Sequence, residues 1–112
     1  MSVIDLDYLA SISDNDREFE AELLGVYIED GEQHLNLANV AIAKQDWESL
    51  AREAHHLKGA SGNVGALGLQ ALALDLENNA KAQNLEQARA ILDWMLEQYQ
   101  QVKDLFQQRY GG

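Results

Sequence analysis

Apolar residues recur every three or four positions along most of this chain, the spacing that places side chains on one face of an α-helix. The longest such pattern lies between residues 16 and 43, where acidic residues occupy much of the opposite face. Its apolar stripe consists of Phe19, Leu23, Leu24, Tyr27, Ile28, Gly31, Leu35, Ala38 and Ile42. The same spacing predicts a short helix over residues 4–11, with Leu6 and Leu9 on its apolar side, and three further helices after residue 45.

Polar residues that favour helix N-termini divide this pattern into segments. An Asp or Asn before the first helical turn accepts a hydrogen bond from a backbone N–H that has no partner within the helix. The expected caps are Asp16, Asp46, Asn63 and Asn84. After the first long helix they predict helices over residues 46–62 and 63–82 and a last helix that starts at residue 84, and no proline interrupts them.

The last two segments differ in how much of their surface is apolar. Residues 63–82 have two apolar stripes, which predicts a helix packed between neighbours. One stripe is Leu67, Ala71 and Leu74, and the other is Leu69, Leu72, Leu76 and Ala80. The last helix has the alternating spacing of a bundle seam, at Ala88, Leu92, Met95, Tyr99, Val102 and Phe106. Together the segments predict an all-α fold: an antiparallel four-helix bundle with a short additional N-terminal helix, in a single domain over residues 1–112.

The 112 residues have a formal net charge of −11, which argues against nucleic acid as a partner because phosphate binding requires clustered Lys and Arg. Residues 1–48 hold 12 acidic and 2 basic side chains, whereas residues 49–112 hold 7 and 6. The absence of cysteine excludes disulfides, thiolate metal sites and thiol nucleophiles. No apolar run reaches membrane-spanning length and no secretory signal pattern is present, so we expect a cytoplasmic protein without a membrane segment. We also expect a monomer, because one bundle can close its own core.

The less acidic part of the chain contains the pattern with the clearest chemical meaning, around His55. Lys58 follows by three residues and therefore shares its helix face. The residues four before, four after and seven after it are small: Ala51, Gly59 and Gly62. A helical glycine costs roughly 0.5–1 kcal/mol relative to alanine, so Gly59 indicates that a partner must come close to His55. Neutral imidazole can attack phosphorus, and an adjacent ammonium offsets the charge of the transferred group.

Residues 54–65 read Ala-His-His-Leu-Lys-Gly-Ala-Ser-Gly-Asn-Val-Gly and closely resemble the signature of histidine-containing phosphotransfer (HPt) domains. Position by position, the resemblance implies that His55 is the phosphorylated nucleophile and that Lys58 stabilises charge. It implies that Gly59 provides steric clearance and that His56 occupies a variable position.

The resemblance extends beyond this motif. Residues 4–9 look like the family's opening helix, and residues 44–47 look like its turn into the histidine-bearing helix. Glu77 falls where the family often has a Gln or Glu that hydrogen-bonds and orients the imidazole.

The resemblance implies a phosphorelay intermediate of a two-component signalling system. It would accept a phosphoryl group from an aspartyl phosphate on a response-regulator receiver domain and pass it to another receiver aspartate. A hybrid sensor histidine kinase is a further implied partner. The chain would need no cofactor of its own, because Mg²⁺ belongs to the receiver, and would have no ATP-dependent kinase activity.

Docking of a receiver has to align donor and acceptor, which requires an accessible surface around the nucleophile. The predicted partner surface consists of Ala51, Gly59, Gly62 and Ala66. The second helix is expected to contribute between residues 27 and 35.

Two other functions fit parts of the sequence. Glu53 and His56 have the Glu-x-x-His spacing of helical carboxylate metal proteins, but such bundles repeat it on a second helix, and here Gly31 precedes His34 at that spacing. A non-catalytic helical adaptor would require no histidine chemistry. A self-contained kinase is disfavoured because no glycine-rich phosphate loop is present.

Overall fold

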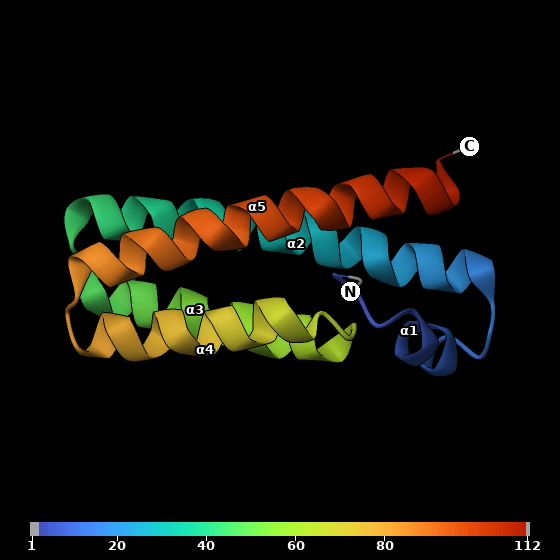
Figure 1. Ribbon diagram of the computed structural model, residues 1–112, viewed down its shortest axis with the longest axis horizontal. Helices are drawn as coiled ribbons and strands as arrows, with labels where there is room; N and C mark the ends of the chain where they lie inside the picture. Colours follow the sequence, from blue (N-terminus) through green and yellow to red (C-terminus); the bar gives the residue numbers. More distant parts are fainter. Residues whose placement is uncertain (1–2, 112) are drawn as a thin grey trace.

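The computed structural model describes residues 3–111, which form five α-helices and, within that range, no β-strand. The helices are α1 (Leu6–Ile12), α2 (Arg17–Lys44), α3 (Trp47–Asn63), α4 (Leu67–Lys81) and α5 (Leu85–Tyr110). Each of the four longer helices packs against two others: α2 against α3 and α5, and α4 against the same pair. Figure 1 shows α2 beside α5 in one layer and α3 beside α4 in the other. The predicted all-α bundle with a short extra N-terminal helix is confirmed.

Side-chain caps explain where three of the four longer helices begin. Asp16, Asp46 and Asn84 each accept a hydrogen bond from a backbone N–H in the first turn of α2, α3 and α5, as predicted. The fourth predicted cap is wrong. Asn63 is the last residue of α3, and α4 starts after Ala66, which makes no side-chain cap.

One hydrophobic core joins the helices. The predicted seam of α5 is buried from Ala88 to Val102, whereas Phe106 is only partly buried. In α4 only one of the two apolar stripes is buried: Leu69, Leu72, Leu76 and Ala80 lie inside, while Leu67, Ala71 and Leu74 are exposed. The prediction that α4 packs between neighbours is confirmed, since α4 contacts α3 and α5. The second apolar stripe is nevertheless exposed, because a helix at the corner of a four-helix bundle leaves its outer side in solvent.

The centre of α2 comes unusually close to α5. A Cβ on Gly31 would lie 1.5 Å from the hydroxyl oxygen of Tyr99, so only glycine fits there. The Tyr99 hydroxyl donates to the carbonyl of Tyr27 at 3.1 Å, and the Tyr27 hydroxyl lies 2.7 Å from Oγ of Ser61. These contacts link α5, α2 and α3 through the core. Phe19, in contrast, is exposed near the start of α2, contrary to its predicted place in the stripe.

The first helix covers the end of the bundle where α2 extends past the shorter pair α3 and α4 (Figure 1). Its start lies at Leu6, two residues later than predicted, because Asp5 acts as the cap. The backbone N–H of Asp5 donates to the carbonyl of Gly65 at 2.9 Å, which ties this segment to the turn between α3 and α4. Ile4 and Leu9 are fully buried beside it.

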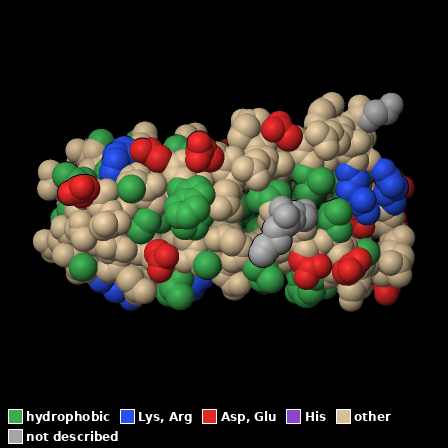
Figure 2. All heavy atoms as spheres, in the orientation of Figure 1, with side chains coloured by type: hydrophobic (Ala, Val, Ile, Leu, Met, Phe, Trp, Pro, Cys, Tyr) green, Lys and Arg blue, Asp and Glu red, His purple; other side chains and the backbone are tan. Residues whose placement is uncertain are grey.

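On the face shown in Figure 2, acidic side chains are scattered, and Lys and Arg side chains appear at both ends, with the largest group at one end. Arg17 and Arg109 meet at that end, where α2 begins and α5 ends. None of the helices in residues 3–111 is both long and apolar enough to cross a membrane.

Candidate functional site

His55 lies near the middle of α3 and projects into solvent along the edge that faces α4. Its side chain is 68% exposed, although Ala54 and Leu57 beside it on the helix are fully buried. The helical repeat explains this arrangement, because residues one and two positions away point to other sides of the helix. The ring is not free of the protein: Nδ1 lies 3.1 Å from Oε2 of Glu77 on α4.

Glu77 is a buried carboxylate surrounded by cationic groups. Its Oε1 accepts a hydrogen bond from Nζ of Lys58 at 3.0 Å, and Nζ of Lys81 lies 3.6 Å from Oε2. The hydrogen bond from Lys58 is the largest cause that lowers the pKa of Glu77; burial opposes it, and His55 and Lys81 add to the lowering. Glu77 is therefore ionised near neutral pH and acts as a hydrogen-bond acceptor.

The charge of Glu77 determines how the neutral imidazole is oriented. A carboxylate can only accept, so Nδ1 of His55 carries the proton and donates it to Oε2. The lone pair of the neutral ring then resides on Nε2, which is the nitrogen away from Glu77. The site thus presents one nucleophilic nitrogen on an exposed and tethered ring.

Gly59 lies one turn after His55 and is exposed. A Cβ at this position would meet no atom of the described residues within 4 Å beyond the helix's own backbone. The fold itself therefore gives no reason for glycine here, in contrast to Gly31. The open space is available to a molecule that approaches His55.

A groove of about 500 Å³ begins at His55 and runs between α3 and α4. Trp47, Ala51, Arg52, Glu77 and Lys81 are among its lining residues. Lys81, Arg52 and Trp47 were not predicted as site residues. Helical spacing could have found them, because Trp47 and Arg52 lie two turns and one turn before His55, and Lys81 lies one turn after Glu77.

The residues of the predicted partner surface do not all lie on a surface. Gly59 is exposed, and Ala51 and Gly62 are half-buried. Ala66 is fully buried, so its prediction is wrong: the turn between α3 and α4 folds it into the core. In the predicted stretch of the second helix, residues 27–35, Asp30 contacts His56 rather than His55.

His56 lies about 100° around α3 from His55 and faces α2 instead of α4. Its Nε2 lies 2.7 Å from Oδ2 of Asp30 on α2. Glu53, which shares the Glu-x-x-His spacing with it, instead lies 2.5 Å from Nδ1 of His34. The two adjacent imidazoles thus contact different helices: His55 reaches α4, and His56 reaches α2.

Comparison with known proteins agrees with this arrangement. The Hpt domain family model matches residues 22–108. The phosphorelay intermediate protein rdeA of Dictyostelium discoideum is 26% identical over 98 residues, which cover 88% of this chain. The chain spans only 39% of the length of that relative.

Two solved structures have the same fold over nearly the whole chain. Histidine-containing phosphotransfer protein B (HptB) from Pseudomonas aeruginosa PAO1 is 30% identical and superposes with a TM-score of 0.88, covering 97% of this chain and 96% of that one. The HPT domain of the Hpt sensor hybrid histidine kinase from Shewanella, at 20% identity, has a TM-score of 0.74 and covers 95% of each chain. The resemblance first seen in residues 54–65 is confirmed, and the chain belongs to the Hpt domain family.

Proposed function

We propose that this chain is a phosphorelay intermediate of a two-component signalling system and that His55 is the residue that receives the phosphoryl group. The observation that supports this most directly is the pairing of an exposed imidazole with a buried, ionised Glu77 at its Nδ1. That pairing fixes which nitrogen is nucleophilic and leaves it accessible. The family membership gives independent support.

This chain and the receiver together supply every atom that phosphoryl transfer needs. The Nε2 lone pair of His55 forms a bond to phosphorus while the bond from phosphorus to the receiver's aspartate oxygen breaks, and the carboxylate leaves with the bonding electron pair. Nδ1 keeps its proton, so the phosphorylated ring is an imidazolium whose positive charge faces Glu77. Transfer to a second receiver is the reverse step with a different aspartate.

Lys58 has two roles in this proposal. Its ammonium donates to Glu77 and so holds the carboxylate toward His55. Its side chain is 29% exposed, which allows the same charge to interact with the transferred phosphoryl group. Lys81, which also lies beside Glu77, adds positive charge at the same edge.

The proposed partners are receiver domains of response regulators, with a hybrid sensor histidine kinase as a further source of phosphate. The groove between α3 and α4 and the open space at Gly59 offer the receiver a route to His55. Mg²⁺ is proposed to belong to the receiver rather than to this chain. We further propose that the chain is a monomeric cytoplasmic phosphocarrier without ATP-dependent kinase activity and forms a single domain over residues 1–112.

The experiment is to mix the protein with a receiver domain phosphorylated by a small-molecule phosphodonor and to follow the label. His55→Gln is expected to abolish labelling, because it removes the nucleophile. His56→Gln is the matched control: it removes the adjacent imidazole, which faces α2, and is expected to retain labelling. Mass spectrometry of the labelled protein should locate the phosphate on His55.

Four results would contradict the proposal. Transfer that persists in His55→Gln would exclude this residue as acceptor. Loss of transfer in His56→Gln with normal folding would move the site by one position. Failure of every phosphorylated receiver to label the wild-type chain, or a phosphate that survives acid but not base, would favour the adaptor alternative.

A further inference from the structure

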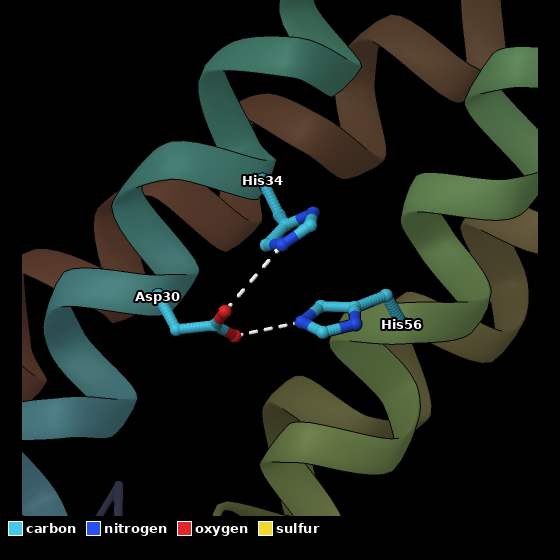
Figure 3. Close-up of side chains that lie close together, drawn as sticks. All are labelled: Asp30, His34 and His56. Carbon is cyan, nitrogen blue, oxygen red and sulfur yellow. Dashed lines mark hydrogen bonds and ion pairs between the residues drawn. The ribbon is translucent and has the colours of Figure 1, made fainter.

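A second cluster of titratable side chains lies between α2 and α3, on the side of α3 away from His55. Asp30 and His34 come from α2 and His56 comes from α3, and their side chains converge as Figure 3 shows. Nε2 of His34 lies 3.4 Å from Oδ1 of Asp30, and Nε2 of His56 lies 2.7 Å from Oδ2. One nitrogen or oxygen atom of each of the three residues lies within 4.8 Å of the other two.

The two imidazoles of the cluster are stacked on one another. Their ring centroids are 3.7 Å apart and their planes differ by 28°. Both rings direct Nε2 toward the same carboxylate (Figure 3).

 The contact with Glu53 indicates which ring nitrogen of neutral His34 carries the proton. Oε2 of Glu53 lies 2.5 Å from Nδ1 of His34, and an ionised carboxylate accepts the proton of that nitrogen. In the neutral ring the lone pair is then on Nε2, where it faces Oδ1 of Asp30. Two acceptors that face each other at 3.4 Å repel unless a proton or a metal ion lies between them, so a metal ion can take the place of a proton here. A histidine that binds a metal through one ring nitrogen commonly donates the N–H of the other nitrogen to a carboxylate, as His34 can donate to Glu53.

We propose that Asp30, His34 and His56 form a binding site for a divalent transition-metal ion, with Glu53 as the residue that orients His34. The metal would bond to Nε2 of each imidazole and to one carboxylate oxygen of Asp30. Water would complete the coordination, since the three side chains are 35%, 22% and 43% exposed. This site is separate from the histidine chemistry proposed at His55 and does not depend on it.

The donor set selects the class of ion. Two imidazole nitrogens and one carboxylate oxygen suit Zn²⁺ and related first-row ions, whereas Ca²⁺ and Mg²⁺ prefer sites made entirely of oxygen. In a tetrahedral site with metal–ligand distances of about 2.0–2.1 Å, the ligand atoms lie about 3.3 Å apart. The 3.4 Å separation of His34 and Asp30 already fits this value. With Oδ1 as the ligand oxygen, Nε2 of His56, which contacts Oδ2 at 2.7 Å, must shift until it lies about 3.3 Å from Oδ1. This ring lies at the surface, where it can move.

The site differs from the carboxylate bundle considered from the sequence. There, Glu53 and His56 on one helix would have been ligands of the same metal. Here, Glu53 acts through His34, and the third ligand, Asp30, lies one turn before His34 on α2. Metal binding would therefore connect α2 to α3.

The test is isothermal titration calorimetry of the untagged full chain with ZnCl₂ near pH 7.5. We expect one Zn²⁺ per chain and loss of this stoichiometric binding in His34→Gln and in His56→Gln. His55→Gln is the matched control, because it removes an adjacent imidazole that faces α4, and it should bind as the wild type does. Glu53→Gln should weaken binding by roughly 10- to 100-fold without changing the stoichiometry.

Titration with Co²⁺ provides a second readout that folding defects alone cannot imitate. Absorption bands of four-coordinate Co²⁺ should appear in the wild type and in His55→Gln and be absent in Asp30→Asn. Far-UV circular dichroism establishes whether each variant retains its helices. The proposal is overturned if the wild type binds no stoichiometric Zn²⁺, if well-folded His34→Gln or His56→Gln binds it normally, or if His55→Gln abolishes binding.

Discussion

The carboxylate of Glu77 is buried against α3 and lies 3.1 Å from Nδ1 of His55, whose ring is otherwise largely exposed to solvent. This contact joins α4 to an exposed edge of α3. It holds the ring without covering it, and it directs the proton of the neutral imidazole to the inner nitrogen. The relative placement of these two residues is therefore the basis of the proposed phosphotransfer.

Replacing Glu77 by alanine should slow phosphotransfer by about 10-fold, equal to roughly 1.4 kcal/mol of barrier. The variant removes the acceptor that holds the ring and the negative charge that faces the phosphorylated imidazolium. Nitrogen NMR of His55 should show a smaller fraction of the Nδ1–H tautomer in the variant. A purely structural role of Glu77 would not produce this change. Asp75→Asn, on the exposed face of the same helix, should leave both the rate and the spectrum unchanged.

Replacing Gly59 by alanine should raise the stability of the protein but slow phosphotransfer. The added methyl group meets only open space, so the free energy of unfolding should rise by roughly 0.5–1 kcal/mol through helix propensity. The same methyl group lies where a receiver approaches His55, so phosphotransfer should fall roughly 10- to 100-fold through misplacement of the reacting groups. Urea unfolding and transfer assays measure the two effects.

A second glycine provides the control for that experiment. A Cβ at Gly25 would make ordinary contacts of 3.6 Å with the ring of Phe106, away from His55. Gly25→Ala should therefore stabilise the protein and leave transfer unchanged. Equal transfer rates in wild type and Gly59→Ala would show that no partner needs the open space.

Replacing Gly31 by alanine should have the opposite effect on stability. The new Cβ would overlap the hydroxyl and ring of Tyr99, and neither helix can move without disturbing the core. Overpacking of this kind typically destabilises by about 1–3 kcal/mol, which urea unfolding would detect. An unchanged midpoint would mean that α2 and α5 lie further apart in solution.

Stability should decrease in acid partly through Glu20, which is 3% exposed near the start of α2. Burial raises its pKa, but hydrogen bonds from Arg109 and Tyr110 outweigh burial and bring the pKa below its ordinary value of 4.5. Because the folded pKa is below the unfolded one, Glu20 stabilises the fold above about pH 4.5 and loses this effect as the pH falls through the folded value.

Glu20→Gln should accordingly be less stable than the wild type at pH 7, and the difference should shrink as the pH is lowered. Urea unfolding midpoints measured between neutral pH and pH 3 would show the convergence. Glu22→Gln, an exposed site on the same helix, serves as the control and should follow the wild type. Parallel curves for Glu20→Gln and the wild type would exclude a role for this carboxylate in acid sensitivity.

Local sequence determined where most helices lie and which one bears the candidate nucleophile. Asp16, Asp46 and Asn84 cap the helices they precede, because an N-cap bond forms between a side chain and the backbone two or three residues later. The positions of His55 and Lys58 on one face also follow from the helical repeat alone. Such relationships need no knowledge of the neighbouring helices.

The sequence-based predictions that were wrong are those that depend on how the helices pack against one another. Leu67 and Leu74 form a regular apolar stripe, yet they are exposed because α4 occupies a corner of the bundle. Ala66 is small and close to the motif in sequence, but the turn that contains it folds into the core. Periodicity states that a face is apolar and does not state whether another helix covers it.

The sequence by itself therefore determined the helices, the family and the residue proposed as phosphoryl acceptor, because all three depend on residues close together along the chain. The family resemblance implied the contact of Glu77 with His55, but only the tertiary structure decided that Lys58 donates to the same carboxylate and that His34 stacks on His56. Those contacts depend on the register of one helix against another. Register is set by the packing of the whole core, which no local pattern contains.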